Sequence, residues 1–340
     1  MKRRKLKKPV KLLLSLFLVI IVSYTSITLF KYYQNSNYNF TIPKLEDNKD
    51  KITKSLENLS YTKDEIKLIK EYVNEQNISY LINNKIDHKI AANFVNEKYY
   101  IDDYLEEYLT YKTEHQDKSY KDIVTIINTH IDKPFYEYDI KTDTTLGKFV
   151  MLNKYYKADT SYPNQEELIT IDGKYHINGT KTKLNKECYE AFLKMFEAAK
   201  NTGPEYAFKL KSAYRSFDTQ VSTYNYWVSL DGKQVADTYS ARAGYSEHQT
   251  GYAFDIRDYN YVHEDYSKST SFTWVSQNAH KYGFIIRFPK GKEHITGYQY
   301  ESWHYRYCGI ECATYIYEND ITFEEYYEYF IKYKNPKNLS

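Results

Sequence analysis

Hydrophobic and polar positions divide the chain into segments of different character. Residues 1–11 are polar and basic, and residues 12–30 form an uncharged, largely apolar run. A helix over this run, at ~1.5 Å per residue, would just cross a membrane core of ~30 Å. The basic residues before it favour a cytoplasmic N-terminus and an extracytoplasmic remainder. We expect an uncleaved, single-pass signal anchor in the cell membrane, with a cleaved signal peptide as the alternative.

A change of periodicity then separates a linker from a helical domain. Residues 31–57 are rich in Asn, Lys and Asp and have few periodic apolar positions, which predicts a solvated linker. Residues 58–140 show apolar positions at helical spacing, beginning with a capping box at Thr62 and Glu65. This pattern predicts a small helical domain. Its sequence lacks a cluster of His, Cys and carboxylate at ligand spacing, so a spacer or packing role is the simpler interpretation and partner binding the alternative.

Residues 146–340 alternate short apolar stretches with helical patterns, which predicts an α+β domain. The expected elements are strands over residues 208–213, 253–256, 284–288 and around 304, and helices over residues 217–228 and 273–280. Gly283 is expected to end the second helix. In the last strand, alternation places His304 on one face and the flanking aromatic residues on the other.

Charge and cysteine content limit the classes of function. The net charge of +2, with 27% charged residues, gives no reason to expect a nucleic-acid partner. The 3 cysteines, Cys188, Cys308 and Cys312, are an odd number, so an extracytoplasmic protein retains at least one unpaired thiol. A bridge between Cys308 and Cys312 is conceivable, but buried thiols are the simpler interpretation.

Two short strings near the C-terminus carry the candidate chemistry, residues 246–255 (SEHQTGYAFD) and residues 301–307 (ESWHYRY). Within them His248, Asp255 and His304 supply two imidazoles and one carboxylate. This is the ligand set of a catalytic zinc that keeps one position open for water. We therefore expect Zn2+ as the cofactor.

Glu301 is the candidate catalytic base, because it precedes His304 by three residues and has no evident partner in the sequence. A carboxylate at that place suits proton transfer from a water. A salt bridge to Arg306 or Arg287 is the alternative. In a regular strand Glu301 would lie on the face opposite His304, so the assignment requires a bend or bulge before the strand.

The pattern Ser-x-His-x-x-Gly-x-Ala-x-Asp followed by Glu-x-Trp-His-x-Arg-Tyr resembles the D-alanyl-D-alanine carboxypeptidase family of VanY-type and LdcB-type enzymes, over about residues 146–320. Flanking pieces that also fit are Asn153–Tyr155, Ala213–Ser216 with Gln220, and Tyr282–Ile285. The resemblance implies a small mixed zinc-peptidase domain of the hedgehog/D,D-peptidase type. It implies removal of a C-terminal D-alanine from peptidoglycan stem peptides, as a D,D- or L,D-carboxypeptidase, outside the membrane. A D,D-dipeptidase, a wall endopeptidase or a non-catalytic peptidoglycan-binding module are the alternatives.

The same resemblance suggests roles for three further side chains. Arg215 would hold the developing oxyanion or the terminal carboxylate of the substrate, which suits a planar guanidinium; pairing with Asp218 is the alternative. Gln220 and Ser246 would contact the substrate, or else satisfy backbone groups. The chain departs from the family pattern at Phe288, where tyrosine is usual, which leaves the preference for the terminal residue open.

Overall fold

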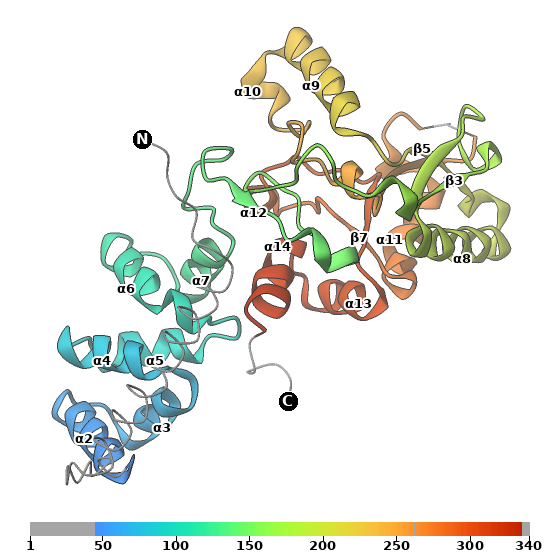
Figure 1. Ribbon diagram of the computed structural model, residues 1–340. Coiled ribbons are helices and arrows are strands. Elements are labelled where there is room, and N and C mark those ends of the chain that lie inside the picture. Colours follow the sequence, from blue (N-terminus) through green and yellow to red (C-terminus); the bar gives the residue numbers. More distant parts are fainter. Residues whose placement is uncertain (1–44, 261–262, 335–340) are drawn as a thin grey trace, which may run out of the picture. The chain divides into compact units, whose positions relative to one another are not determined.

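The computed structural model describes residues 45–260 and 263–334 (Figure 1). The chain forms two compact units, residues 1–58 and 59–340. The predicted basic segment, the signal anchor and the first part of the linker lie outside the described residues. Among the helices of the described ranges, none combines the length and the apolar character that a membrane span requires.

The described part of the first unit corrects the linker prediction. Residues 45–57, predicted as part of a solvated linker, lie within helix α2 (Leu45–Asn58). Ile52 and Leu56 are four positions apart and share one helical face, and Leu56 is fully buried. The helix was not predicted because the segment is polar. Lys and Glu have high helix propensities, but they are also common in solvated linkers.

Helices predominate over the first part of the second unit, as predicted. They are α3 (Lys63–Tyr72), α4 (Glu75–Asn83), α5 (His88–Asn96), the 3-10 turn η1 (Asp102–Tyr104), α6 (Leu105–Glu114) and α7 (Tyr120–Asn128). The capping box before α3 is confirmed: the backbone N–H of Glu65 donates to Thr62 Oγ1 at 3.3 Å, and that of Thr62 donates to Glu65 Oε2 at 2.8 Å. Ile66 and Ile69 bury the predicted face.

A four-stranded antiparallel sheet organises the rest of the unit. Its strands are β5 (Phe208–Ser212), β6 (Ala253–Asp258), β7 (Phe284–Ile286) and β8 (His304–Tyr307), in the order β5-β6-β8-β7. Two smaller pairs accompany it, the parallel β1 (Ile140–Lys141) and β2 (Tyr156–Lys157) and the antiparallel β3 (Leu168–Ile171) and β4 (Thr182–Asn185). The α+β prediction is confirmed.

Seven helices accompany the strands in residues 186–326 of the described chain. They are α8 (Lys186–Thr202), α9 (Phe217–Asp231), α10 (Lys233–Ala236), α11 (Thr270–Asn278), α12 (Glu293–Thr296), α13 (Ile310–Asn319) and α14 (Phe323–Tyr326). Shorter turns are η2 (Thr144–Phe149), η3 (Gln165–Glu167), η4 (Gly173–Tyr175), η5 (Pro204–Tyr206), η6 (Glu247–Thr250), η7 (Tyr266–Lys268), η8 (Ala279–Tyr282) and the π-helical η9 (Tyr327–Lys332). Gly283 follows η8 with a φ of 87°, which confirms the predicted stop.

One face of the sheet carries the hydrophobic core. Phe192 of α8 packs against Phe208 of β5 and Phe254 of β6, with ring centroids 5.9 and 5.4 Å apart. Tyr305 of β8 and Val275 of α11 join the same cluster. The alternate residues of β6 and β8 therefore face away from the core, which leaves the opposite face of the sheet for polar side chains.

The three cysteines are free and buried. This confirms the interpretation as buried thiols rather than a disulfide framework.

Candidate active site

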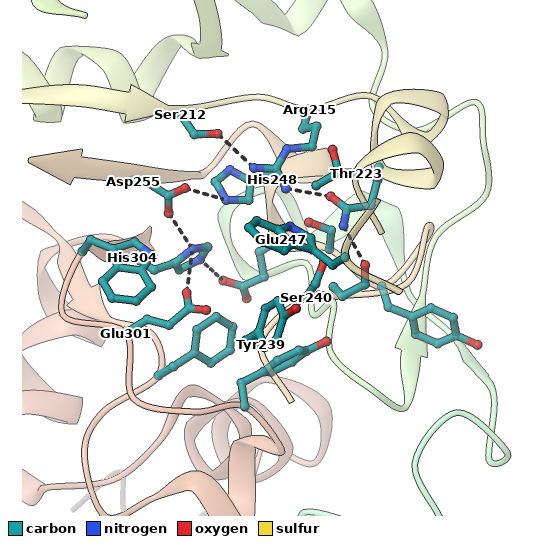
Figure 2. Close-up of a pocket in the computed structure, with 18 of the residues that line it drawn as sticks. Ser212, Arg215, Thr223, Tyr239, Ser240, Glu247, His248, Asp255, Glu301 and His304 are labelled. Carbon is teal, nitrogen blue, oxygen red and sulfur yellow. Dashed lines mark hydrogen bonds and ion pairs between the residues drawn. The ribbon is translucent and has the colours of Figure 1, made fainter. Parts of the chain in front are cut away.

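The three predicted metal ligands converge on the polar face of the sheet. Asp255 of β6 pairs in register with His304 of β8, and His248 reaches the same point from η6. The Oδ1 atom of Asp255 lies 3.1 Å from Nδ1 of His304, and its Oδ2 atom lies 3.4 Å from Nε2 of His248 (Figure 2). One ligand atom from each residue lies within 4.8 Å of the other two. These distances allow a single cation to contact all three.

A glycine shapes the turn that delivers His248. Gly251 ends η6 with a φ of 73°, in the left-handed region that favours glycine. A Cβ atom at this position would lie 2.5 Å from Cδ2 of Leu168. The turn therefore requires glycine for both its backbone conformation and its close packing.

Each imidazole has a second contact that selects the nitrogen facing the cation point. The Nδ1–H of His248 donates to the carbonyl of Ala213 at 2.7 Å, which leaves Nε2 for the metal. The Nε2 atom of His304 lies 3.7 Å from Oε2 of Glu247, which leaves Nδ1 for the metal. Such outer contacts with carbonyls and carboxylates are usual for metal-binding histidines.

Charge at the site also suits a cation. Burial opposes ionisation of Asp255, but His248 and His304 hold the pKa of this carboxyl well below its usual range. Burial lowers the pKa of His248, which favours the neutral imidazole that a metal ligand requires. For His304 burial, which lowers the pKa, is outweighed by the neighbouring carboxylates of Asp255 and Glu247, which raise the pKa to about 9. A bound cation would have to displace that proton.

Glu247 is a site residue that the sequence reasoning missed. Its Oε1 atom accepts hydrogen bonds from Arg287 Nε at 2.7 Å and from Arg306 Nη1 at 2.8 Å. Burial opposes ionisation, but the two guanidinium groups hold the pKa of Glu247 far below its usual range. Arg287 also contacts Glu324, at 2.6 and 2.8 Å. A buried charge cluster thus stands directly behind His304.

Glu301 lies three residues before the first residue of β8, next to the place where His248, Asp255 and His304 converge. The backbone N–H of His304 donates to the carbonyl of Glu301 at 3.4 Å, so the chain turns here and the predicted bend is confirmed. Oε2 of Glu301 lies 3.7 Å from Nδ1 of His304. The alternative salt bridge is wrong, because Arg287 and Arg306 contact Glu247 instead. Burial raises the pKa of Glu301 to about 8, which suits a group that takes up and releases a proton.

Arg215 follows β5 and is held by two neighbours. Its Nη1 donates to Gln220 Oε1 at 2.8 Å and its Nη2 donates to Ser212 Oγ at 3.1 Å, so these residues take the place of the alternative partner Asp218. Gln220 in turn donates from Nε2 to the carbonyl of Ala241 at 2.6 Å. The amide of Gln220 therefore positions Arg215.

A cavity of about 510 Å³ unites these side chains. All seven predicted site residues line it: His248, Asp255, His304, Glu301, Arg215, Gln220 and Ser246. Tyr239 and Ser240 lie across the cavity from Asp255 in Figure 2. Phe288 also lines the cavity, with its ring centroid 4.9 Å from that of His304. Where the family pattern has a tyrosine hydroxyl, this chain presents only an apolar ring to the imidazole.

Two imidazoles, one carboxylate and an adjacent buried glutamate in a cavity form the arrangement of a mononuclear metallohydrolase. The D-alanyl-D-alanine carboxypeptidase family VanY matches residues 181–310. The chain is 41% identical over 182 residues to YodJ of Bacillus subtilis (strain 168), covering 52% of this chain and 66% of that protein, just under two thirds. It is 33% identical over 133 residues to the bifunctional D-Ala-D-Ala dipeptidase and D-Ala-D-Ala carboxypeptidase VanXYC of Enterococcus gallinarum, covering 38% of this chain and 70% of that protein.

Among solved structures, the LdcB LD-carboxypeptidase matches with a TM-score of 0.51 and 37% identity, over 57% of this chain and 91% of that chain. The chain belongs to the D-alanyl-D-alanine carboxypeptidase family.

Proposed function

We propose that this protein is a zinc-dependent carboxypeptidase that removes a C-terminal D-alanine from peptidoglycan stem peptides. The observation that carries the proposal is the convergence of His248, Asp255 and His304 in one cavity with Glu301. The names of the relatives, which include D-Ala-D-Ala and LD-carboxypeptidases, support the substrate class.

The donor set and its surroundings support zinc as the metal. Two imidazole nitrogens and one carboxylate oxygen are ligands that zinc prefers, and three protein ligands leave a position for water. The outer contacts from Ala213 and Glu247 orient the imidazoles as a metal site requires. Zinc held by these residues would polarise the scissile carbonyl and lower the pKa of the attacking water toward ~7.

The protein side chains then divide the remaining work. Glu301, ionised, accepts the proton of the water as the water attacks the scissile carbonyl, and passes it to the leaving amine. Its raised pKa favours this return step, because a weakly acidic carboxyl holds the proton until the amine leaves. Arg215 supplies positive charge to the developing oxyanion or to the terminal carboxylate of the peptide. Gln220 and Ser212 fix the orientation of that guanidinium, which reduces the reorganisation needed on binding.

Two rival activities remain within this proposal. The Enterococcus gallinarum relative is named as both a dipeptidase and a carboxypeptidase, so a D,D-dipeptidase is the second candidate. A wall endopeptidase would use the same site on a cross-link. A non-catalytic peptidoglycan-binding module is less compatible with this chain, because Glu301 and Arg215 are both retained at the cavity.

The location of the activity is also a proposal. A signal anchor over residues 12–30, with the preceding basic residues in the cytoplasm, would hold the cavity on the outer side of the cell membrane. Peptidoglycan stem peptides are found there, which agrees with the proposed substrate.

Defined substrates test the proposal directly. The purified protein is incubated with stem tetrapeptides and pentapeptides, with zinc or with a chelator, and the products are identified by mass spectrometry. We expect release of one D-alanine in the presence of zinc, and loss of this activity with Glu301→Gln while zinc stays bound. A free dipeptide as the product would favour the rival, and unchanged turnover by Glu301→Gln would exclude Glu301 as the base.

A further inference from the structure

The strand that supplies Asp255 to the metal point carries a second charged residue on the same face. Phe254 and Ile256 point into the core, so Asp255 and Arg257 face the opposite side. Two residues along a strand span ~7 Å. Arg257 lines the same cavity as the proposed metal ligands. The guanidinium of Arg257 therefore forms part of the cavity wall, two residues along the strand from the proposed ligand Asp255.

This guanidinium is buried, and two of its three nitrogen atoms are unpaired within the described part of the chain. Arg257 is only 7% exposed, yet its Nε and Nη1 atoms have no hydrogen-bond partner among the residues that the structure describes. The other two buried arginines of the sheet differ: Arg287 and Arg306 both donate to Glu247. Burial of an unpaired charge is costly, so a bound anion is the expected compensation.

The cavity carboxylates cannot supply this anion, because each has another role. Glu247 accepts hydrogen bonds from two arginines, Asp255 lies between the two histidines, and Glu301 lies beside His304. The exposed Lys211 of β5 lines the same cavity and adds positive charge.

A neighbouring ring fixes the guanidinium. The guanidinium carbon of Arg257 lies 5.1 Å from the ring centroid of Trp303, the residue before His304. Stacking on an aromatic face holds a guanidinium plane in one orientation while its N–H edges remain able to bind a ligand. A planar guanidinium pairs most strongly with a carboxylate, through two parallel hydrogen bonds.

We propose that Arg257, assisted by Lys211, forms a carboxylate-binding subsite that recognises an anionic group of the peptide substrate. This inference rests on the proposed peptidase function and adds a specificity determinant to it. The carboxylate has two possible sources: the C-terminal carboxylate of the peptide, or the side-chain carboxylate of a diamino acid such as meso-diaminopimelate. The ligand chemistry is the same for both.

Four peptides separate the two sources. Each is an acyl-diamino acid-D-Ala-D-Ala peptide that contains either meso-diaminopimelate or lysine, and ends in either a carboxylate or a carboxamide. Their dissociation constants are measured by calorimetry on the full chain loaded with zinc and carrying Glu301→Gln, so that no peptide is consumed. The same series is measured after adding Arg257→Gln or Arg257→Lys. Lys209→Gln is the matched control, because Lys209 pairs opposite Arg257 in the sheet but stacks on Tyr259.

We expect the loss of one of the two carboxylates to weaken binding by about 10- to 100-fold when Arg257 is present, as for a charge-assisted hydrogen bond. That difference should disappear with Arg257→Gln, persist with Lys209→Gln and be partly kept by Arg257→Lys. The carboxylate whose removal matters identifies the source. The inference is overturned if neither carboxylate affects binding in the protein that retains Arg257, a comparison that needs no folded variant. It is also overturned if Arg257→Gln weakens all four peptides equally.

Hydrolysis by the protein with Glu301 intact separates this inference from the proposed function. Cleavage of the peptides without discrimination between their carboxylates would overturn the subsite and leave the peptidase proposal standing. If the protein distinguishes the carboxylates in binding but cleaves none of the peptides, the subsite stands and the peptidase proposal is overturned.

Discussion

The Oε2 atom of Glu247 lies 3.7 Å from Nε2 of His304, on the side of the imidazole away from the metal point. The other carboxylate oxygen is held by Arg287 and Arg306. A buried charge cluster therefore lies against the imidazole of a proposed ligand, on the side of its Nε2 atom.

Replacing Glu247 with Gln should weaken zinc binding by about 10- to 100-fold, as for other outer contacts of metal-binding histidines. The amide keeps the shape of the side chain but removes the charge that faces His304. Competition with a chelating dye measures the affinity, and the exposed Glu264 serves as the control with the same substitution. Unchanged zinc affinity would show that the glutamate supports only the arginines.

Activity should be lost as the pH falls, because Glu301 acts as a base only when it is ionised. Burial raises its pKa from 4.5 to about 8, and a cation at the metal point would lower it from that value. The acidic limb of kcat/KM should therefore have its midpoint between 4.5 and about 8. Rates measured with zinc held at saturation test this, and a midpoint at or below 4.5 would contradict it.

Removing the metal should lower thermal stability, because the proposed zinc site is assembled only in the folded protein. At a free zinc concentration of about 100 times Kd the stabilisation is about 2.7 kcal/mol. This corresponds to a Tm increase of roughly 5 °C for a unit of this size. The increase should grow as the pH rises toward 9, because zinc must displace the proton of His304. His248→Ala is the control and should show little response to zinc in the same melting experiment.

Gly251→Ala should destabilise the fold by about 1–3 kcal/mol through backbone strain, and should also weaken zinc binding. The added Cβ would lie 2.5 Å from Leu168, so the turn that carries His248 must shift. Gly179→Ala is the control, since its φ of 68° also lies in the region that favours glycine but nothing lies within 4 Å of the added atom. Chemical denaturation and zinc titration of both variants separate the two effects. Equal zinc affinity in both would contradict the packing argument.

Sequence reasoning identified the parts of the site that depend on short local patterns. The strings around His248 and His304 contain the ligands, and strand alternation placed His304 opposite the core, as the structure confirms. The roles of Glu247 and Arg257 could not be predicted in this way. Each has the appearance of an ordinary surface charge, and its environment depends on which strands pair and in which register. Helix α2 was missed because its polar composition fits a solvated segment equally well.

The turn that enters β8 places Glu301 and His304 on one short span of backbone, tied by a hydrogen bond between them. The separation between the proposed proton acceptor and the ligand His304 is therefore set by local geometry rather than by the docking of distant elements. Helix α9 supplies Trp227 to the cavity wall, and a change of that side chain leaves this separation unaltered. The cavity wall at Trp227 can therefore be reshaped for a different substrate while the proton acceptor keeps its place beside His304.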